Sequence, residues 1–337
     1  MPDHCLTIMA STLDPSQIAG AGYLVASVLF ILGINGMTHP RTAVRGNLLG
    51  AAGMLVAVLV TVFKLQLVSL GLAAVAMAIG AAIGLWLAVR VQMTEMPELV
   101  ALFNGLGGVA SLLVAGAEVA RASVNSAAGE TATGVAAGAP FSFAPFYFAA
   151  GLAGVIGAVT LTGSLIAAGK LQGLKLVEIT PPAWLQALSA LLAATTVALL
   201  VMLIAGAPLP YPLAFWALVL TAAALGVTLV LPIGGADMPV VISLLNSYSG
   251  LAAAAAGFMI GNDVLIIAGS LVGASGLILT RIMCRAMNRS LANVVFGKLE
   301  PTADGPSADE VYEGKIKATS PEEVAMVLDG AQRVVIV

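Results

Sequence analysis

Charged residues are scarce in this sequence, and their scarcity decides the class of protein. Asp, Glu, Lys and Arg make up 9% of the 337 residues, whereas hydrophobic residues make up 60% and the mean hydropathy is +1.04. A soluble domain carries about 25% charged residues. So few charges cannot cover a folded chain of this length in water, which excludes an ordinary soluble protein and places most of the chain in a lipid bilayer.

Residues that build disulfides and metal sites are also nearly absent. Cys5 and Cys284 lie far apart, and the two histidines are His4, in the N-terminal tail, and His39, in a predicted loop. These positions argue against a disulfide framework and against a histidine-based metal site. The N-terminus lacks a basic stretch followed by a small-residue cleavage motif, so we expect the first apolar run to be retained as a span.

Long apolar runs fill most of the sequence. Each is close to the roughly 20 residues that a helix needs to cross the hydrocarbon core. They predict an all-α polytopic membrane protein, a bundle of about nine transmembrane helices with its N-terminus outside. The runs lie near residues 18–36, 46–63, 66–89, 97–120, 141–169, 183–206, 210–231, 238–260 and 263–283.

Lysine and arginine positions predict the orientation, because short cytoplasmic loops are enriched in these residues. With nine spans and the N-terminus outside, nine basic residues fall on the cytoplasmic side and two, Lys64 and Arg121, fall outside. The C-terminal tail is therefore predicted to be cytoplasmic. The nine are Arg41, Arg45, Arg90, Lys170, Lys175, Arg281, Arg285, Arg289 and Lys298.

An internal repeat links the predicted fourth and eighth spans. The segment EMPELVALFNGLGG at 95–108 matches DMPVVISLLNSYSG at 237–250, with an acid, Met-Pro, an Asn and a Gly at the same offset. Both segments open a helix on the cytoplasmic side, so the repeat is parallel. Glu95 and Asp237 occupy positions where a helix N-cap accepts backbone N–H bonds, and the following prolines suit the first helical turn.

Each copy places an asparagine, Asn104 or Asn246, about 10 Å into its helix. An unpaired amide inside a bundle costs several kcal/mol, so each needs a partner or water. A structural interhelical hydrogen bond would satisfy this need, and so would a polar pathway, which the matched pair favours. Hydroxyls in spans usually bond to their own helix. The polar side chains open to such a pathway are Asn104, Asn246, Ser164, Thr160, Thr162, Ser243 and Tyr248.

Composition divides the chain into four parts. Residues 1–17 form an N-terminal extension, 18–290 the transmembrane domain, and 291–319 a polar, acidic cytoplasmic linker. In the remainder, 320–337, Ser320-Pro-Glu-Glu predicts a capped helix ending near Asp329, and residues 333–337 predict a buried strand. A helix and one strand cannot bury a core alone, so this segment is expected to be the truncated start of a soluble Rossmann-like α/β domain.

Three segments carry a specific resemblance. EMPELVA at 95–101, GGADMPVVISLLNSYSG at 234–250 and CRAMNRS at 284–290 resemble the β subunit of proton-translocating NAD(P) transhydrogenase, and the similarity extends from about residue 18 to the end. The resemblance implies hydride transfer between NADH and NADP+ coupled to inward proton movement across a bacterial inner membrane. It implies NADP(H) on the soluble domain that follows the spans and NAD(H) on a partner α subunit, with two αβ units per complex. This chain alone would be catalytically incomplete.

The resemblance also implies roles for individual residues. Asn246 and Ser164 match channel residues of the family. Asp237 matches an acid at the cytoplasmic mouth that couples the channel to the NADP(H) domain, and Arg289 matches an arginine just after the last span. The polar side chains and the repeat add Asn104 and Tyr248 to the pathway and Glu95 to the mouth. The helix-face glycines of the family correspond to Gly250 and Gly276.

One departure from the family concerns the proton carrier. Many members have a histidine where this chain has Asn104, and asparagine does not titrate. Either a water wire carries the proton, or the membrane helices of the α subunit supply the titrating group. We favour the second, because no side chain in these spans titrates near neutrality at mid-membrane.

Two other functions would also fit a polytopic bundle. A secondary transporter for a small solute would explain the parallel repeat and the polar residues at mid-bundle. A purely structural membrane subunit would need Asn246 and Asp237 for assembly only. The predicted helices show no interruption that would form a solute site, and the tail points to a nucleotide-binding domain.

Overall fold

The computed structural model describes residues 15–64, 70–127, 143–174, 177, 182, 184–206, 209–296 and 321–330. Within these residues the regular elements are helices. Contacts divide the chain into two units, Met1–Gly297 and Lys298–Val337. The first unit contains every predicted span and is described first.

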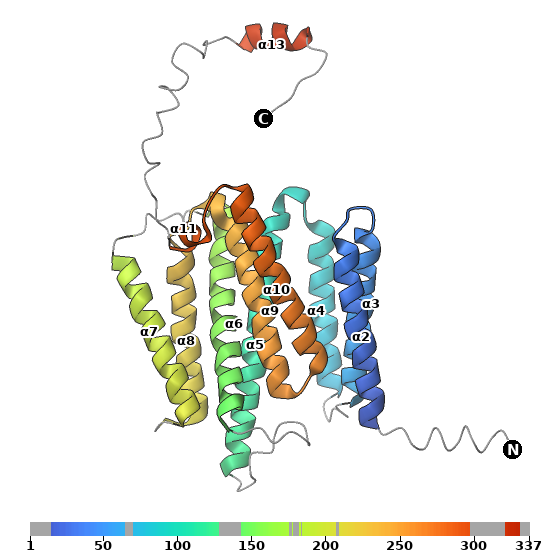
Figure 1. Ribbon diagram of the computed structural model, residues 1–337, viewed down its shortest axis with the longest axis vertical. Coiled ribbons are helices and arrows are strands. Elements are labelled where there is room, and N and C mark those ends of the chain that lie inside the picture. Colours follow the sequence, from blue (N-terminus) through green and yellow to red (C-terminus); the bar gives the residue numbers. More distant parts are fainter. Residues whose placement is uncertain are drawn as a thin grey trace, which may run out of the picture. The chain divides into compact units, whose positions relative to one another are not determined.

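Nine helices of the described residues are long and apolar enough to cross a membrane, as the apolar runs predict (Figure 1). Each predicted run corresponds to one helix. The largest difference in length is in the fourth, which continues to Ala127 where the sequence predicts an end near residue 120. The helices are α2 (Pro15–Met37), α3 (Ala43–Lys64), α4 (Leu70–Arg90), α5 (Met96–Ala127), α6 (Phe143–Leu171), α7 (Trp184–Ala205), α8 (Tyr211–Val230), α9 (Met238–Ile260) and α10 (Asp263–Ala286).

Helices α5, α6, α8 and α9 form the centre of the bundle, and α6 contacts the other three (Figure 1). Their shared apolar cluster is rich in alanine and includes the fully buried Phe215, Leu218 and Ala150. Alanine and glycine allow helix backbones to approach closely where lipid supplies no hydrophobic force between helices. Close packing of small residues therefore builds the part of the bundle that carries the polar groups described below.

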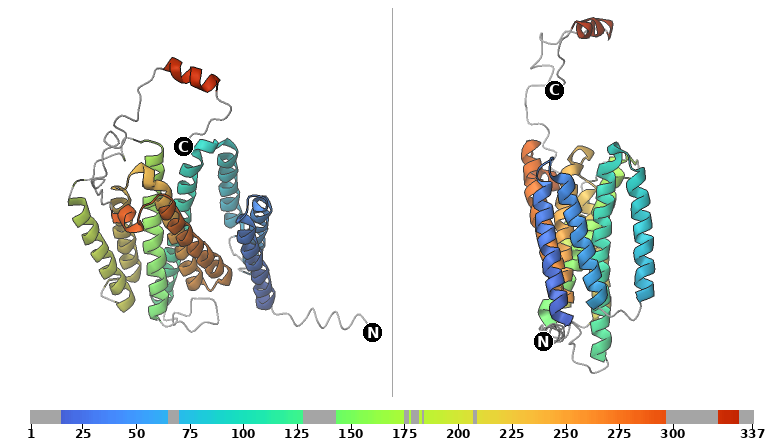
Figure 2. Two further views of the ribbon diagram at one scale, coloured as in Figure 1. Left: turned by 45° about the horizontal axis from the view of Figure 1, so that its top comes forward. Right: turned by 90° about the vertical axis from the view of Figure 1, so that its right-hand side faces the viewer.

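The other helices lie around this centre (Figure 2). α7 packs mainly on α8, α10 packs on α9, and the paired helices α2 and α3 join the bundle through the contact of α2 with α10. None of the span Gly71–Arg90 in α4 is buried. Many large apolar side chains of these outer helices are exposed, as expected for helices that face lipid or partner helices.

The sequence repeat is matched by repeated structure. A short 3₁₀ turn, η1 (Met93–Glu95), leads directly into α5, and an equivalent turn, η2 (Gly235–Asp237), leads into α9. Both helices begin at the same end of the bundle, and they contact each other (Figure 1). We call this the Asp237 end.

The predicted linker begins with a helix. Residues 291–296, at the start of the predicted linker, form α11 (Leu291–Phe296), in which Val294 is 2% exposed within the apolar cluster at the Asp237 end. In the second unit the predicted helix is present as α13 (Pro321–Asp329). Ser320 and the predicted strand at 333–337 lie outside the described residues, as do residues 1–14 of the N-terminal extension.

Candidate functional site

Two glycines of α5, Gly105 and Gly108, lie so close to α6 that a side chain at either position would press against it. A methyl group added at Gly108 would lie 2.6 Å from the carbonyl oxygen of Gly157, and one at Gly105 would lie 3.3 Å from the Cβ atom of Ser164. The two backbones therefore nearly touch along this face. The arrangement brings Asn104, one residue before Gly105, against α6.

Asn104 and Ser164 form a buried polar pair across this contact. The Nδ2 atom of Asn104 donates a hydrogen bond of 2.9 Å to Oγ of Ser164. Ser164 is fully buried and Asn104 is 7% exposed. The Oδ1 atom of Asn104 is buried without a hydrogen-bond partner. The amide NH₂ group of Asn104 is thus hydrogen-bonded, whereas its carbonyl oxygen is a buried acceptor without a donor.

Helices α9 and α10 also meet through glycines. A methyl group at Gly250 would lie 2.6 Å from the backbone nitrogen of Gly273, and one at Gly276 would lie 2.8 Å from Cβ of Ser247. Hydroxyl groups bridge the same contact: Ser247 donates to the carbonyl of Gly273, and Ser243 to that of Gly276. This face of α9 therefore packs against α10 along the contact.

Asn246 and Tyr248 lie apart from the Asn104–Ser164 pair. Asn246 is half-buried, and its amide makes no hydrogen bond among the described residues. Around the axis of α9, the Asn246 side chain points between the directions of its two neighbours: Leu245, which faces Gly163 of α6, and Ser247, which faces α10. Tyr248 packs against the apolar cluster at the Asp237 end. No direct bond joins either residue to Asn104 or Ser164 in the described part of the chain.

Asp237 and Arg289 form an ion pair that joins the start of α9 to the end of α10. The Nη1 atom of Arg289 lies 2.8 Å from Oδ2 of Asp237. The Asp237 side chain is 11% exposed, whereas that of Arg289 is 55% exposed. Asn288, in the left-handed conformation at φ 52°, ends α10 and lets the N–H of Arg289 bond to the carbonyl of Cys284 at 2.9 Å.

This ion pair corrects the predicted role of Asp237. Asp237 does occupy the N-cap position of α9, but its side chain makes no capping hydrogen bond. Its second oxygen, Oδ1, is buried without a partner. The carboxylate is directed to a cation 52 residues later in the chain, and not to the helix that it precedes.

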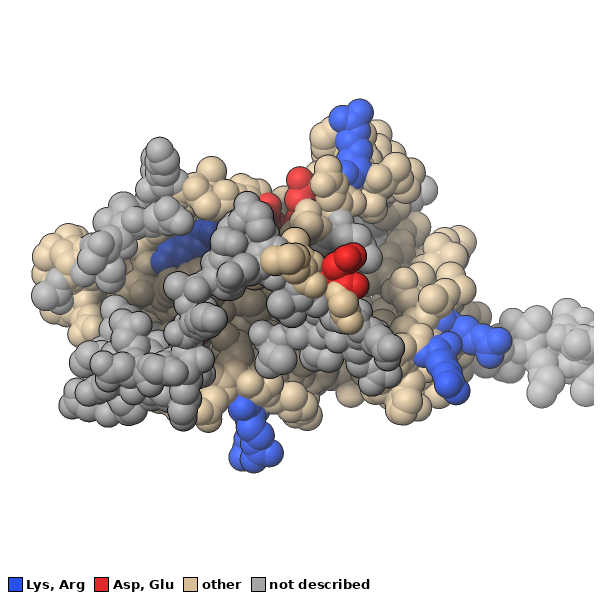
Figure 3. All heavy atoms as spheres, turned by 90° about the horizontal axis from the view of Figure 1, so that it is seen from above, with Lys and Arg blue, Asp and Glu red and all other residues tan. Residues whose placement is uncertain are grey.

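Glu95 occupies a different environment at the same end of the bundle. Its carboxylate accepts a hydrogen bond of 3.4 Å from the N–H of Gln92, which closes a capping box around η1. With Glu98 it lines a hollow of about 490 Å³ between α4, α5 and α6. In the view of Figure 3 the surface of the described residues is mostly uncharged, with a few isolated basic and acidic side chains.

Lys170 is a residue of this end that the sequence did not identify as part of the site. Its Nζ atom donates to the carbonyl oxygens of Leu231 and Ile233, which follow the last turn of α8. A cation is favoured beside the unpaired carbonyls of a helix C-terminus. Lys170 therefore fixes the loop that leads from α8 into η2 and so positions Asp237.

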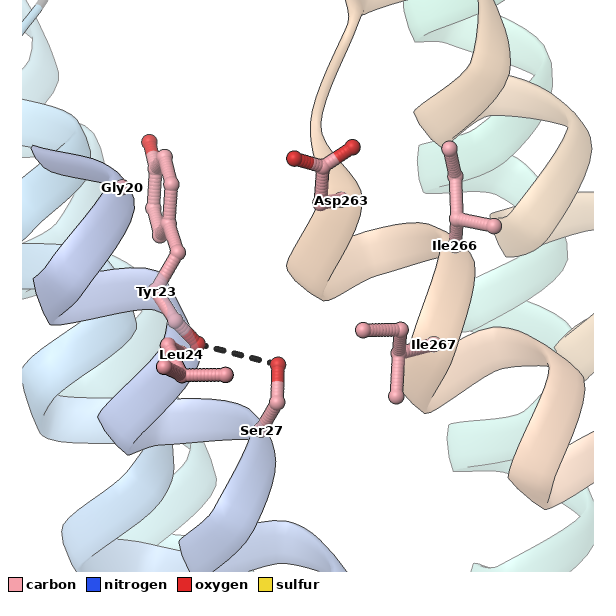
Figure 4. A pocket seen from close by; sticks show the side chains of 7 residues that line it. All are labelled: Gly20, Tyr23, Leu24, Ser27, Asp263, Ile266 and Ile267. Carbon is pink, nitrogen blue, oxygen red and sulfur yellow. Dashed lines mark hydrogen bonds between the residues drawn. The ribbon is translucent and has the colours of Figure 1, made fainter. Parts of the chain in front are cut away.

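A second hollow, of about 470 Å³, lies between α2 and α10. Figure 4 shows Tyr23 and Ser27 of α2 facing Asp263 and Ile267 of α10 across it. Ser27 donates to the carbonyl of Tyr23 on its own helix. Asp263 begins α10 and Arg289 follows its last turn, so this hollow is at the opposite end of α10 from the ion pair.

Comparison with known proteins identifies the family. The family described as NAD(P) transhydrogenase beta subunit matches residues 19–337. Two curated proteins from Rhodospirillum rubrum, one assigned to a particular strain, are both named NAD(P) transhydrogenase subunit beta. Each is 42% identical to this chain over 348 residues, which cover 94% of this chain and 66% of the relative. The chain thus spans a little less than two thirds of the length of these relatives. This chain is a multi-pass membrane protein that belongs to the NAD(P) transhydrogenase beta subunit family.

Proposed function

We propose that this chain is the membrane, proton-conducting part of a transhydrogenase that couples hydride transfer between NADH and NADP+ to inward proton translocation. The observation that carries the proposal is the buried Asn104–Ser164 pair, whose amide oxygen is left unsatisfied at the centre of a bundle of this family. A purely structural hydrogen bond would leave no such acceptor in a low-dielectric interior, since an unmade bond there costs about 1–3 kcal/mol.

The proton carrier is proposed to come from outside this chain. Neither Asn104 nor Ser164 titrates near neutral pH, so the pair can hold and orient water but cannot store a proton. Asn246, half-buried and without a hydrogen bond in the described residues, is suited to a group presented by another helix. The unburied α4 leaves room for such helices on the bundle surface. The partner is an α subunit whose membrane helices supply an ionisable side chain.

The ion pair at the Asp237 end is proposed to be the coupling point. Breaking the Asp237–Arg289 contact would remove the one ion pair of the described residues that joins the start of α9 to the segment after α10. A nucleotide-driven change beyond residue 296 would act on Arg289 through α11, which contacts α8, α9 and α10. Glu95, in its separate hollow, would take part in docking and not in the ion pair.

The remaining parts of the assembly follow from the same proposal. NADP(H) would bind the soluble domain that begins at about residue 320, and NAD(H) the α subunit, with two αβ units in the complex. The distribution of lysine and arginine supports an N-terminus outside and a cytoplasmic C-terminal side in a bacterial inner membrane. The Asp237 end would then face the cytoplasm, where the nucleotides are.

A solute transporter is not favoured. Transporter sites of this kind use interrupted helices whose broken ends bind the substrate, whereas α5, α6 and α9 are continuous over their full lengths. The two functions are separated by one experiment on the whole αβ complex in proteoliposomes. Our proposal predicts that NADH and an oxidised NADP analogue together change the internal pH and that an uncoupler abolishes this change. Uptake of a small solute without nucleotide, with no change in pH, would contradict it.

A further inference from the structure

Thr160 is the buried hydroxyl in the described residues that lacks any hydrogen-bond partner. It is fully buried on α6, and its Oγ1 atom has neither a protein donor nor an acceptor. Other buried hydroxyls return to a backbone carbonyl: Ser111 bonds to Gly107 and Thr228 to Leu225. Threonine in a helix readily makes such a bond to its own preceding turn. Its absence at Thr160 therefore needs an explanation.

Thr160 lies on the same face of α6 as Ser164, one helical turn away. A methyl group added at Gly108 of α5 would lie 3.1 Å from Cβ of Thr160, as one at Gly105 would lie 3.3 Å from Cβ of Ser164. Both hydroxyl residues therefore face the glycine strip of α5 that begins next to Asn104. Neither glycine has a side chain that could bond to Thr160.

Three hydrogen-bonding functions remain unused at this contact. The hydroxyl proton of Thr160 and that of Ser164 have no acceptor among the described residues, and Oδ1 of Asn104 has no donor. A water molecule has two donor protons and two acceptor lone pairs. It can accept from Thr160 and Ser164 and donate to Asn104, which leaves one proton free. Buried waters typically make about three hydrogen bonds to otherwise unsatisfied groups.

We propose that Asn104, Ser164 and Thr160 form an internal water site between α5 and α6, and that Thr160 is a positioning residue that extends the polar route one turn beyond Ser164. The inference deepens the proposed function, because the free proton of this water is the group that would pass a proton onward. The existence of the water site, however, depends only on the three side chains and not on proton transport.

The test compares Thr160→Val with Thr160→Ser in the complete αβ complex, with Thr196→Val as the matched control. Thr196 is also buried, but its hydroxyl already bonds to the carbonyl of Leu192 at 2.7 Å. Valine has the shape of threonine without the hydroxyl, and serine keeps the hydroxyl. The readouts are thermal unfolding, density for an ordered water in a high-resolution map, and nucleotide-driven proton translocation.

We expect water density in contact with Thr160 in the wild type and in Thr160→Ser, and none in Thr160→Val. Proton translocation should fall about 2- to 12-fold in Thr160→Val, the equivalent of one hydrogen bond, and stay near wild type in Thr160→Ser and in Thr196→Val. A dry contact predicts the reverse for the valine variant: a higher Tm, because an orphan hydroxyl is removed, with translocation and density unchanged. That result would overturn the proposal.

The two proposals fail in different ways. Water density at Thr160 in a wild-type complex that moves no protons would contradict the proposed function and leave the water site standing. Full proton translocation with no water density, and with Thr160→Val more stable than wild type, would contradict the water site alone. If Thr160→Val does not assemble, the density in the wild type and in Thr160→Ser decides the question.

Discussion

Arg289 Nη1 and Asp237 Oδ2 lie 2.8 Å apart and connect the end of α10 to the start of α9. Asp237 directly precedes α9 and Arg289 follows α10, and these two helices meet closely through glycines. The ion pair therefore lies at one end of a tight contact. Its carboxylate is largely buried and its guanidinium is half-exposed. Asp237 is therefore fixed within the protein, whereas Arg289 is accessible from outside. This arrangement suits a contact that a neighbouring domain can break.

Arg289→Ala should uncouple the complex more than it destabilises it. Ion pairs of exposed residues typically contribute about 0.2–1 kcal/mol to folding, and because Arg289 is half-exposed we expect the Tm to fall by only a few degrees. The carboxylate of Asp237 would remain without its cation, and the ratio of protons moved per hydride transferred should drop. Parallel assays of pH change and nucleotide reduction measure this ratio.

The matched variant for this prediction is Arg285→Ala. Arg285 is a basic residue one turn earlier on α10, and it forms no ion pair in the described residues. It should leave the ratio unchanged. Equal ratios in Arg289→Ala and Arg285→Ala would show that the ion pair has no part in coupling.

Lys170→Met should loosen the loop before Asp237. The variant keeps the length of the side chain but removes the charged donor of two hydrogen bonds to the carbonyls of Leu231 and Ile233. Hydrogen bonds from a charged group contribute about 1.5–3 kcal/mol each, and partial exposure lowers this figure. Thermal unfolding should show a loss of about 2 kcal/mol, and backbone amides near Gly234 should exchange faster with deuterium.

Arg45→Met serves as the control for Lys170, because Arg45 is exposed and has no hydrogen bond or ion pair in the described residues. Its stability should be close to that of the wild type. Equal unfolding curves for the two variants would mean that Lys170 does not hold the loop.

Gly276→Ala should force α9 and α10 apart. The new methyl group would lie 2.8 Å from Cβ and 2.9 Å from Cα of Ser247, closer than packed carbon atoms allow. Overpacking of this kind costs about 1–3 kcal/mol, and the bond from Ser243 to the Gly276 carbonyl should lengthen. In contrast, Gly80→Ala has nothing within 4 Å of its methyl group and should stabilise α4 slightly. Differential scanning calorimetry of both variants measures the difference in Tm between them. Equal Tm values would contradict the prediction.

The extent of the spans followed from the sequence because length and apolarity alone decide which segments can cross a bilayer. The repeat was equally informative. In both halves a 3₁₀ turn ends at the acid of the repeat, Glu95 or Asp237, and the α-helix begins at the methionine that follows. Local chemistry sufficed here, since the acid, the methionine and the proline act on neighbouring backbone.

The site was harder to predict because its contacts join residues far apart in the chain. The prediction that the Asp237 side chain caps α9 was wrong, because the carboxylate bonds to Arg289 instead. Nothing in the local sequence indicates that Arg289 comes within reach. Lys170 was interpreted only as an orientation signal, although its position after a long span and near the end of α6 is also typical of a cation that caps a neighbouring helix. Asn104 and Ser164 were predicted as separate pathway residues, and their hydrogen bond required the helix packing.

The most direct test of the central claim is the proton-to-hydride ratio of Ser164→Ala in the reconstituted αβ complex. Removing the hydroxyl leaves the buried amide of Asn104 without its one partner, and we predict that proton translocation falls about tenfold while NADP(H) binding is retained. Ser189→Ala, which removes a hydroxyl bonded only to its own helix on α7, is the control and should behave as wild type. A Ser164→Ala complex that assembles and moves protons at the wild-type ratio would contradict the claim that the proton passes the Asn104–Ser164 pair.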